Sequence, residues 1–315
     1  MQYRDKIAEV YHSISPHIRK TPVLHSNYFS GKLNCEIFFK CENLQYTNSF
    51  KLRGAFNKIS SIPDKKNKII IASSGGNHGL GVTYAANHFG MKTIIVVPEF
   101  VPQFRIEMIK ALGAEVIIHG KTMDDMNNKV AEFTQDSKYI YVHPFDDAEV
   151  IAGQATVAYE LLEECPDIDV IVVSIGGGGL ISGIAQYAKA FNPNIIIYGT
   201  QTFGADAMSQ SLQAGKIVTI PGITSIATSL GATKVAERTF AIVQQNVKNV
   251  VAVTDAEAIR DLKDILAHEK LLVEPASSCN LSAIISGQLE NLHGKNVAVI
   301  LCGGNFSLEQ LKSYL

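Results

Sequence analysis

The chain has 315 residues, of which 46% are hydrophobic and 18% charged, and its formal net charge at pH 7 is −2. This composition is typical of a folded globular protein and argues against a disordered or fibrous chain. Because the lysines and arginines are scattered, the sequence indicates no binding surface for nucleic acid or for an anionic membrane, and a small-molecule partner is expected.

The N-terminal segment lacks the features of a secretory signal. Residues 1–20 mix charged and apolar side chains without a continuous apolar stretch, and no apolar run anywhere in the chain reaches about 18 residues. We therefore expect a cytoplasmic protein.

From about Lys68 onward, short apolar runs alternate with helical patterns. The predicted strands are Lys68–Ala72, Lys92–Val97, Ala114–Gly120, Tyr139–Phe145, Val170–Gly176, Asn194–Gln201 and Val297–Gly304. The predicted helices include Met123–Phe133, one that starts near Leu180, and Thr254–Glu269, where Thr254 and Glu257 fit a capping box. The strands are continuously apolar, which is typical of parallel sheets covered by helices on both faces.

At this length, either one large α/β unit or two closely packed domains are expected. The sequence shows no fixed-period repeat, no low-complexity segment and no flexible Gly/Ser linker. Any second domain is therefore expected to be inserted in the first, which predicts a hinge between them.

The first chemical motif is the octet Asn48–Ala55, in which Lys51 lies between Phe50 and Leu52 just before a predicted helix. A lysine that is desolvated in such a place has a lowered pKa and can form a Schiff base. A surface lysine at the start of a helix is the alternative for this octet taken alone.

The second motif, Ser73-Ser74-Gly75-Gly76-Asn77-His78-Gly79, directly follows a predicted strand and opens a helix. Such a turn presents backbone N–H groups to an anion, and its glycines let a ligand approach the backbone closely. A carboxylate fits this turn, and an ordinary strand-to-helix loop is the alternative.

The third motif is the run Gly176–Gly179, followed by Leu180. Four consecutive glycines cost on the order of 0.5–1 kcal/mol each relative to alanine, and phosphate bound by the loop N–H groups at a helix N-terminus offsets this cost. A dinucleotide site is disfavoured because Thr200 and Gln201 stand where an acidic residue is required. A purely structural loop is the other alternative.

The fourth motif is Leu301-Cys302-Gly303-Gly304-Asn305, at the end of a predicted strand. Ligands of parallel sheets lie at the carboxyl ends of the strands, where the Cys302 thiol can contact a ring nitrogen. A buried small apolar side chain is the alternative. The five cysteines form no CxxC pair and no even framework, so neither a disulfide scaffold nor a zinc cluster is indicated.

Together, NSFKLRGA, SSGGNHG, GGGGL and CGGN, in this order and spacing, resemble the fold type II pyridoxal-phosphate enzymes, specifically the serine/threonine dehydratase and serine racemase group. The resemblance covers nearly the whole chain. It implies an α/β fold of the tryptophan synthase β type, with parallel-rich twisted sheets flanked by helices. A large cofactor-binding domain (residues 1–66 and 148–315) is expected to contain a small inserted domain (residues 67–147) that carries the substrate loop.

The resemblance implies pyridoxal 5'-phosphate as the cofactor, with Lys51 as the residue that forms the Schiff base and removes the Cα proton. The implied cofactor-binding residues are Phe50, Lys51, Asn77, Gly176, Gly177, Gly178, Gly179, Leu180, Glu274 and Cys302. The implied substrate-binding residues are Ser73, Ser74, Gly75, Gly76, His78 and Phe145.

The implied reaction is α,β-elimination from a 3-hydroxy amino acid such as L-threonine or L-serine, which yields a 2-keto acid and ammonia. Gly75 stands where the racemase has a serine that works as the second base, so racemisation is expected to be feeble. Phe145 stands where the racemase has an asparagine. Cation-binding members have a glutamate and an aspartate where this chain has Gln201 and Ala207, so no metal is expected there.

Two alternatives to the dehydratase remain: a serine racemase, and a catalytically silent protein of the same fold that binds the cofactor and senses amino acids. β-Replacement is disfavoured by His78, because the substrate loop of β-replacement enzymes resembles SGNTG, whereas this chain has GGNHG. The resemblance also implies a homodimer. Because the chain ends at Leu315, shortly after CGGN, we expect no regulatory domain of the kind found in biosynthetic threonine dehydratases.

Overall fold

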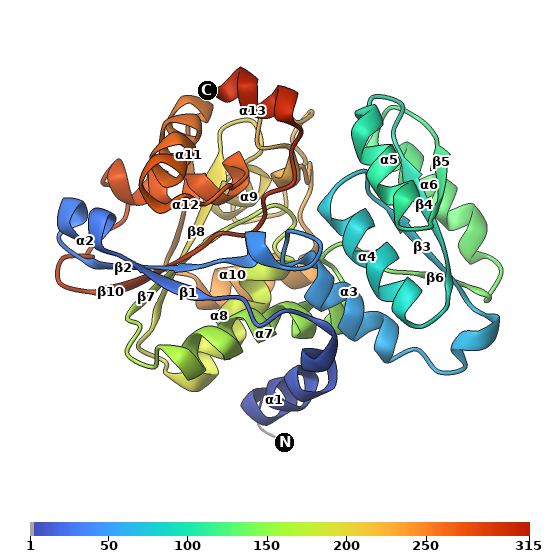
Figure 1. The fold of residues 1–315 in the computed structure, drawn as a ribbon, viewed down its shortest axis with the longest axis horizontal. Helices are drawn as coiled ribbons and strands as arrows, with labels where there is room; N and C mark the ends of the chain where they lie inside the picture. The colour runs from blue at the N-terminus through green and yellow to red at the C-terminus, as the bar shows by residue number, and fades with distance from the viewer. Residues whose placement is uncertain (1–2) are drawn as a thin grey trace.

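The strands form two separate sheets in residues 3–315, the part of the chain that this computed structural model describes. The larger sheet has six strands in the order β1-β2-β10-β7-β8-β9, and the smaller has four in the order β5-β4-β3-β6. Neighbouring strands are parallel except for β1 and β2, which are antiparallel. Figure 1 shows the two sheets and their helices as two lobes placed side by side.

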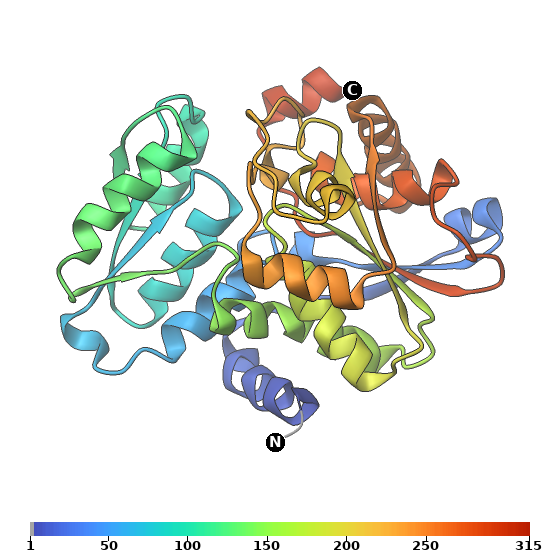
Figure 2. The ribbon, with the colours of Figure 1, turned by 180° about the vertical axis from the view of Figure 1, so that it is seen from behind.

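The larger sheet is covered by helices on both faces. Its strands are β1 (Val23–Ser26), β2 (Glu36–Lys40), β7 (Val170–Ser174), β8 (Ile196–Thr202), β9 (Asn249–Val253) and β10 (Asn296–Ile300). Its helices are α1 (Tyr3–Ile14), α2 (Asn27–Leu33), α3 (Lys51–Ser60), α7 (Ala148–Glu164), α8 (Gly179–Phe191), α9 (Ala207–Ala214), α10 (Glu237–Asn246), α11 (Asp255–Glu269), α12 (Pro275–Ile285) and α13 (Leu308–Tyr314). In Figures 1 and 2, α11 and α12 lie above this sheet, and α7, α8 and α10 lie below it. All five residues of β7 are buried, as its continuous apolar run predicts.

The smaller sheet also lies between two helical layers. Its strands are β3 (Ile69–Ser73), β4 (Lys92–Val97), β5 (Glu115–Ile118) and β6 (Tyr139–Tyr141), and its helices are α4 (Asn77–His88), α5 (Gln103–Ala111) and α6 (Met123–Thr134). Alternate side chains of β3 point to opposite faces, so that Ile70 packs with α4 and α5 whereas Ile71 packs with Val130 of α6. Single-turn helices η1 (Ser15–His17), η2 (Glu42–Leu44), η3 (Lys65–Asn67) and η4 (Thr228–Leu230) complete the fold.

The predicted elements agree with the structure except at some ends. The predicted strand Lys92–Val97 coincides with β4, and the capping box is confirmed because Thr254 and Glu257 each accept the other's backbone N–H. The strand predicted over Tyr139–Phe145 is too long, since β6 ends at Tyr141. Beyond that residue the chain turns, and His143 Nδ1 accepts the N–H groups of residues 145 and 146 at 3.2 and 2.7 Å.

Helices α3 and α7, which flank the smaller sheet in the sequence, are joined along their length. The N–H of Gly54 donates to Gln154 Oε1 at 3.2 Å, and Lys58 Nζ lies 2.7 Å from an oxygen of Asp147. A Cβ atom at Gly153 would lie 2.5 Å from the carbonyl oxygen of Arg53, so only glycine permits this close approach. Helix α3, whose first residue is Lys51, is therefore held tightly against α7.

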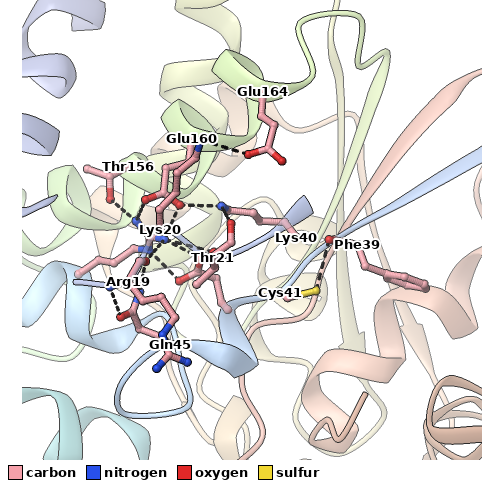
Figure 3. Close-up of polar contacts among 12 residues, drawn as sticks. Arg19, Lys20, Thr21, Phe39, Lys40, Cys41, Gln45, Thr156, Glu160 and Glu164 are labelled. Atoms are coloured by element: carbon pink, nitrogen blue, oxygen red, sulfur yellow. Dashed lines mark hydrogen bonds and ion pairs between the residues drawn. The ribbon is translucent and has the colours of Figure 1, made fainter. Parts of the chain in front are cut away.

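A buried network of charges includes Arg53, in the first turn of α3, and Figure 3 shows two of its members, Lys40 and Glu160. Arg53 lies 2.7 Å from Glu42 and 2.7 Å from Glu160, and Lys40 Nζ lies 2.6 Å from Glu160. All four side chains are at most 1% exposed. The two positive and two negative groups balance, and Thr21 supplies further hydrogen bonds to Lys40 and Glu42. Buried charges are tolerated only when they are paired in this way.

Within residues 3–315, no helix combines the length and the apolar character needed to cross a membrane.

Candidate active site

One pocket collects residues from all of the predicted cofactor-binding motifs. It is lined by Phe50, Lys51, Asn77, Phe145, Ser174, Gly176, Gly177, Gly178, Gly179, Leu180, Ser229, Leu230 and Cys302. The pocket lies where strands β7 and β10 end, as expected for parallel sheets. Of the predicted cofactor-binding residues, only Glu274 is outside the lining. It accepts a hydrogen bond from the side chain of Asn77, which does line the pocket.

Lys51 is partly buried in this pocket, at the start of α3. Its Nζ donates a hydrogen bond to the carbonyl oxygen of Pro144 at 2.7 Å and lies 5.2 Å from the centre of the Phe50 ring. Burial lowers the pKa of Lys51 to about 8. An amine with this pKa is a much better nucleophile near neutral pH than an ordinary lysine, so the chemistry predicted for Lys51 fits its surroundings.

The four glycines after β7 form a cradle for an anion. In the described part of the chain, none of their N–H groups donates a backbone hydrogen bond, and Gly178 has a φ of 93°. A Cβ atom at Gly177 would lie 2.1 Å from a carbon of the Phe145 ring, so a larger residue is sterically excluded. Free N–H groups at the start of the 13-residue helix α8 suit a phosphate.

Cys302 also lines this pocket, and its side chain is a neutral thiol. Burial and the nearby Glu274 carboxylate raise its pKa to about 11, and its Sγ lies 3.3 Å from Ser277 Oγ. A neutral thiol can contact a pyridine nitrogen but does not hold that nitrogen protonated as a carboxylate would.

The side-chain amide of Asn77 is held in one orientation. Its Nδ2 donates to Glu274 Oε1 at 3.0 Å, and its Oδ1 accepts from Asn305 Nδ2 at 2.8 Å. The N–H of Asn305 also donates to Glu274 at 2.6 Å. Asn305 was not among the predicted site residues, although it is the last residue of the CGGN motif. The lining residues Ser174, Ser229 and Leu230 were also missed, because no motif marks them.

The predicted substrate loop, residues 73–78, lies beside the pocket, and the side chains of Ser73 and His78 point away from it. Ser73 Oγ hydrogen-bonds Asn127 of α6 at 3.2 Å and Tyr141 at 2.9 Å, on the opposite face of the smaller sheet from α4. Of the predicted substrate-binding residues, only Phe145 lines the pocket itself. The residues outside the lining are Ser73, Ser74, Gly75, Gly76 and His78.

The first turn of α4 carries free backbone donors. Among the described residues, the N–H groups of Asn77, His78 and Gly79 have no hydrogen-bond acceptor on the backbone or on a side chain. The His78 ring is buried and bonds the carbonyl oxygen of Val142 at 2.8 Å. Burial, followed by the charge of Lys51, lowers the pKa of His78 to about 3, so its ring is neutral and braces α4. His78 can therefore serve a ligand through its N–H but not as an acid near neutral pH.

Gln201 stands where cation-binding relatives are expected to have a glutamate, and its side-chain amide is fully hydrogen-bonded within the protein. Its Nε2 donates to the carbonyl oxygens of Ile175 and Ala205 at 2.9 and 3.0 Å, and its Oε1 accepts the N–H of Ser209. Ile175 immediately precedes the glycine cradle, so this amide stabilises the loop. Within residues 3–315, no group of three or more His, Cys, Asp or Glu side chains is arranged to hold a metal ion.

We expect activity to be unchanged when the enzyme is treated with a metal chelator, because the Gln201 amide bridges the two carbonyl oxygens. Gln201→Glu should behave differently, since a carboxylate facing two carbonyl oxygens forms a set of oxygen ligands suited to Mg²⁺ or Ca²⁺. Its activity should fall in chelator and recover with the cation. Loss of wild-type activity in chelator, with recovery on adding Mg²⁺, would contradict this expectation.

The fold and the pocket define a pyridoxal-phosphate enzyme, because a partly buried lysine with a lowered pKa, a glycine cradle suited to phosphate and a neutral thiol line one cavity. A family model described as pyridoxal-phosphate dependent enzyme matches residues 14–303. The chain therefore belongs to this family, which confirms the predicted family, fold class and cofactor.

Several relatives and solved structures resemble the chain over almost its whole length. It is 38% identical over 306 residues to an L-threonine ammonia-lyase of Geobacter sulfurreducens, covering 97% of this chain and 76% of the relative. It is 36% identical over 313 residues to the catabolic L-threonine dehydratase TdcB of Staphylococcus aureus, covering 98% and 90%. Maize serine racemase matches with a TM-score of 0.93 and 34% identity, covering 98% of this chain and 95% of that structure.

Proposed function

We propose that this protein is an ammonia-lyase that converts L-threonine or L-serine to a 2-keto acid and ammonia. The observation that carries the proposal is the partly buried Lys51, with a pKa of about 8, in one pocket with the unpaired glycine cradle. The relatives named as threonine ammonia-lyase and threonine dehydratase support this substrate class. A silent sensor is disfavoured, since it has no need of the reactive lysine.

Pyridoxal phosphate, when bound, supplies the electron withdrawal that acidifies the substrate's Cα–H bond. In the proposal, Lys51 anchors the cofactor and then accepts the Cα proton at Nζ. Phe50, Asn77 and Cys302 would contact the cofactor ring, and Glu274 holds the Asn77 amide in orientation through a hydrogen bond. The phosphate would be held by Gly176, Gly177, Gly178, Gly179 and Leu180.

The substrate is proposed to bind between the loop before α4 and the segment that contains Phe145. The free N–H groups at the start of α4, including that of His78, are suited to the α-carboxylate. Gly75 and Gly76 allow the substrate to approach the backbone, and Ser73 and Ser74 precede them in the same loop.

Elimination is expected to exceed racemisation, although maize serine racemase has a similar structure. A racemase needs proton-transfer groups on both faces of Cα, whereas elimination needs one base and a proton for the leaving hydroxyl. Gly75 has no side chain to serve the face opposite Lys51. With L-serine, pyruvate should therefore form much faster than D-serine when both are measured in one reaction. Equal rates would overturn the ammonia-lyase assignment.

A serine at position 75 tests the same explanation, but it needs space. A Cβ atom at Gly75 would lie 2.2 Å from Val101 Cγ2. We therefore expect the double variant Gly75→Ser/Val101→Ala to increase the proportion of D-serine, with Val101→Ala alone as the matched control. No increase in the double variant would remove the absent side chain as the cause of the preference.

We further propose two domains, a homodimer and a cytoplasmic location. The domain boundaries, residues 1–66 and 148–315 for the large domain and 67–147 for the small one, are supported by the sheets, because β3 to β6 all lie within 67–147. The dimer rests on the family resemblance, and the location rests on the mixture of charged and apolar side chains in residues 1–20. Light scattering of the purified protein would contradict the dimer if it gave the mass of a single chain.

A further inference from the structure

A second cavity adjoins the proposed active site and shares Ser229 with it. Arg105 of α5, from the smaller sheet's helical layer, forms one wall. Thr228 and Ser229 of η4, with Gln310 and Tyr314 of α13, contribute to the facing walls. The cavity therefore lies between the two lobes, next to the cofactor pocket, and Arg105 is the only cationic residue of its lining.

The guanidinium of Arg105 has no anionic partner in the described part of the chain. Its side chain is partly buried, and its guanidinium carbon lies 5.8 Å from the centre of the Phe104 ring. The only carboxylate in the cavity wall is Glu274, which already accepts hydrogen bonds from Asn77 and from the N–H of Asn305. A partly desolvated guanidinium without a partner is well suited to bind an anion from solution.

Arg105 also lies directly against the substrate loop. A Cβ atom at Gly76 would lie 3.3 Å from Arg105 Nη1. Gly76 immediately precedes the first turn of α4, whose N–H groups are free. An anion at this loop would therefore lie close to both kinds of donor, and a guanidinium can bind both oxygens of a carboxylate at once.

We propose that Arg105 binds the α-carboxylate of the amino-acid substrate, together with the N–H groups of the substrate loop. The α-carboxylate is inferred because Arg105 Nη1 lies beside the substrate loop, so the inference does not depend on any particular substrate side chain. This inference rests on the proposed function and names a further substrate-binding residue for it.

The test replaces Arg105 with glutamine and, separately, with lysine. Lys110→Gln is the matched control, because it removes the same charge from an exposed position on the same helix. For Arg105→Gln, KM for L-threonine should rise about tenfold or more with a much smaller change in kcat. The KM of Arg105→Lys should lie between those of the wild type and Arg105→Gln, since lysine keeps the positive charge and lacks the planar guanidinium. Lys110→Gln should match the wild type.

A binding measurement separates this role from an effect on the chemical step. L-alanine has the α-carboxylate but no hydroxyl to eliminate, and its binding is followed by the change in cofactor absorbance. Its Kd should rise in Arg105→Gln by about the same factor as KM, while the absorbance without amino acid stays as in the wild type. An unchanged Kd, or an altered absorbance before L-alanine is added, would overturn the proposal.

A third measurement uses 3-hydroxyaspartate, which carries a side-chain carboxylate in addition to the α-carboxylate. A loss confined to this substrate, with L-threonine and L-alanine unaffected, would assign Arg105 to a side-chain carboxylate and overturn the α-carboxylate assignment. The proposed function fails separately, if the wild type releases no 2-keto acid from L-threonine or L-serine. In that case the L-alanine titration still decides the role of Arg105.

Discussion

Replacing Lys51 with alanine is expected to abolish turnover of L-threonine and L-serine and to remove the visible absorbance of covalently held cofactor. Lys51 is both the anchor of the cofactor and the proposed Cα base, and within residues 3–315 its Nζ donates a hydrogen bond only to the carbonyl oxygen of Pro144. No other lysine lines the pocket. The measurements are keto-acid release and the absorption spectrum of the purified variant.

Lys66→Ala, at an exposed lysine outside the pocket, is the control and should retain both properties. Deamination by Lys51→Ala at the wild-type rate would refute the assignment of Lys51.

The pKa of about 8 for Lys51 adds a second readout, which uses the apoprotein. Because the neutral amine attacks the cofactor's aldehyde, the rate of reconstitution should increase as pH rises through about 8. A flat profile across this range would contradict the role of that pKa.

Replacing Glu160 with glutamine is expected to lower the free energy of unfolding by about 3–5 kcal/mol, because it leaves the buried Arg53 and Lys40 charges with too little compensation. Glu164→Gln is the matched control, since it lies one turn later on α7 and pairs with Lys20 at 3.4 Å at the surface. Figure 3 shows both glutamates. An exposed pair of this kind contributes about 0–1 kcal/mol. Urea unfolding of the two variants measures the difference, and equal losses would contradict a special role for the buried network.

The same network predicts how stability depends on pH. Burial alone raises the pKa of Glu160, but the charges and hydrogen bonds of Arg53 and Lys40 outweigh burial, so that the net pKa is lowered. A carboxyl group with a lowered pKa in the folded state contributes stability above its ordinary pKa and loses it as the pH falls. Glu160→Gln should therefore lose less stability on acidification than the wild type. An identical acid dependence would argue against this contribution.

Much of the fold could be predicted because its signals are local. A capping box such as Thr254–Glu257 involves residues three apart, and a continuous apolar run such as that of β7 requires burial on both faces of a sheet. The cofactor pocket could be predicted for a related reason, since glycine runs and the octet around Lys51 directly follow or precede regular elements. The ends of the strands were predicted less well. Strand β6 ends at Tyr141, because the chain then turns and His143 accepts the N–H groups of residues 145 and 146, and these contacts lie beyond the strand.

The sequence by itself determined the family and the cofactor, through the resemblance carried by four short motifs in their order and spacing. It also determined the glycine cradle, because the backbone chemistry of a glycine run is set by neighbouring residues. Only the tertiary structure decided where the side chains point. Ser73 turns toward α6, Val101 fills the space beside Gly75, and Arg105 reaches the substrate loop from another helix. The partners of Arg53 are likewise up to 107 residues away in the chain. Such contacts depend on how the two sheets and their helices pack, and no local pattern specifies that packing.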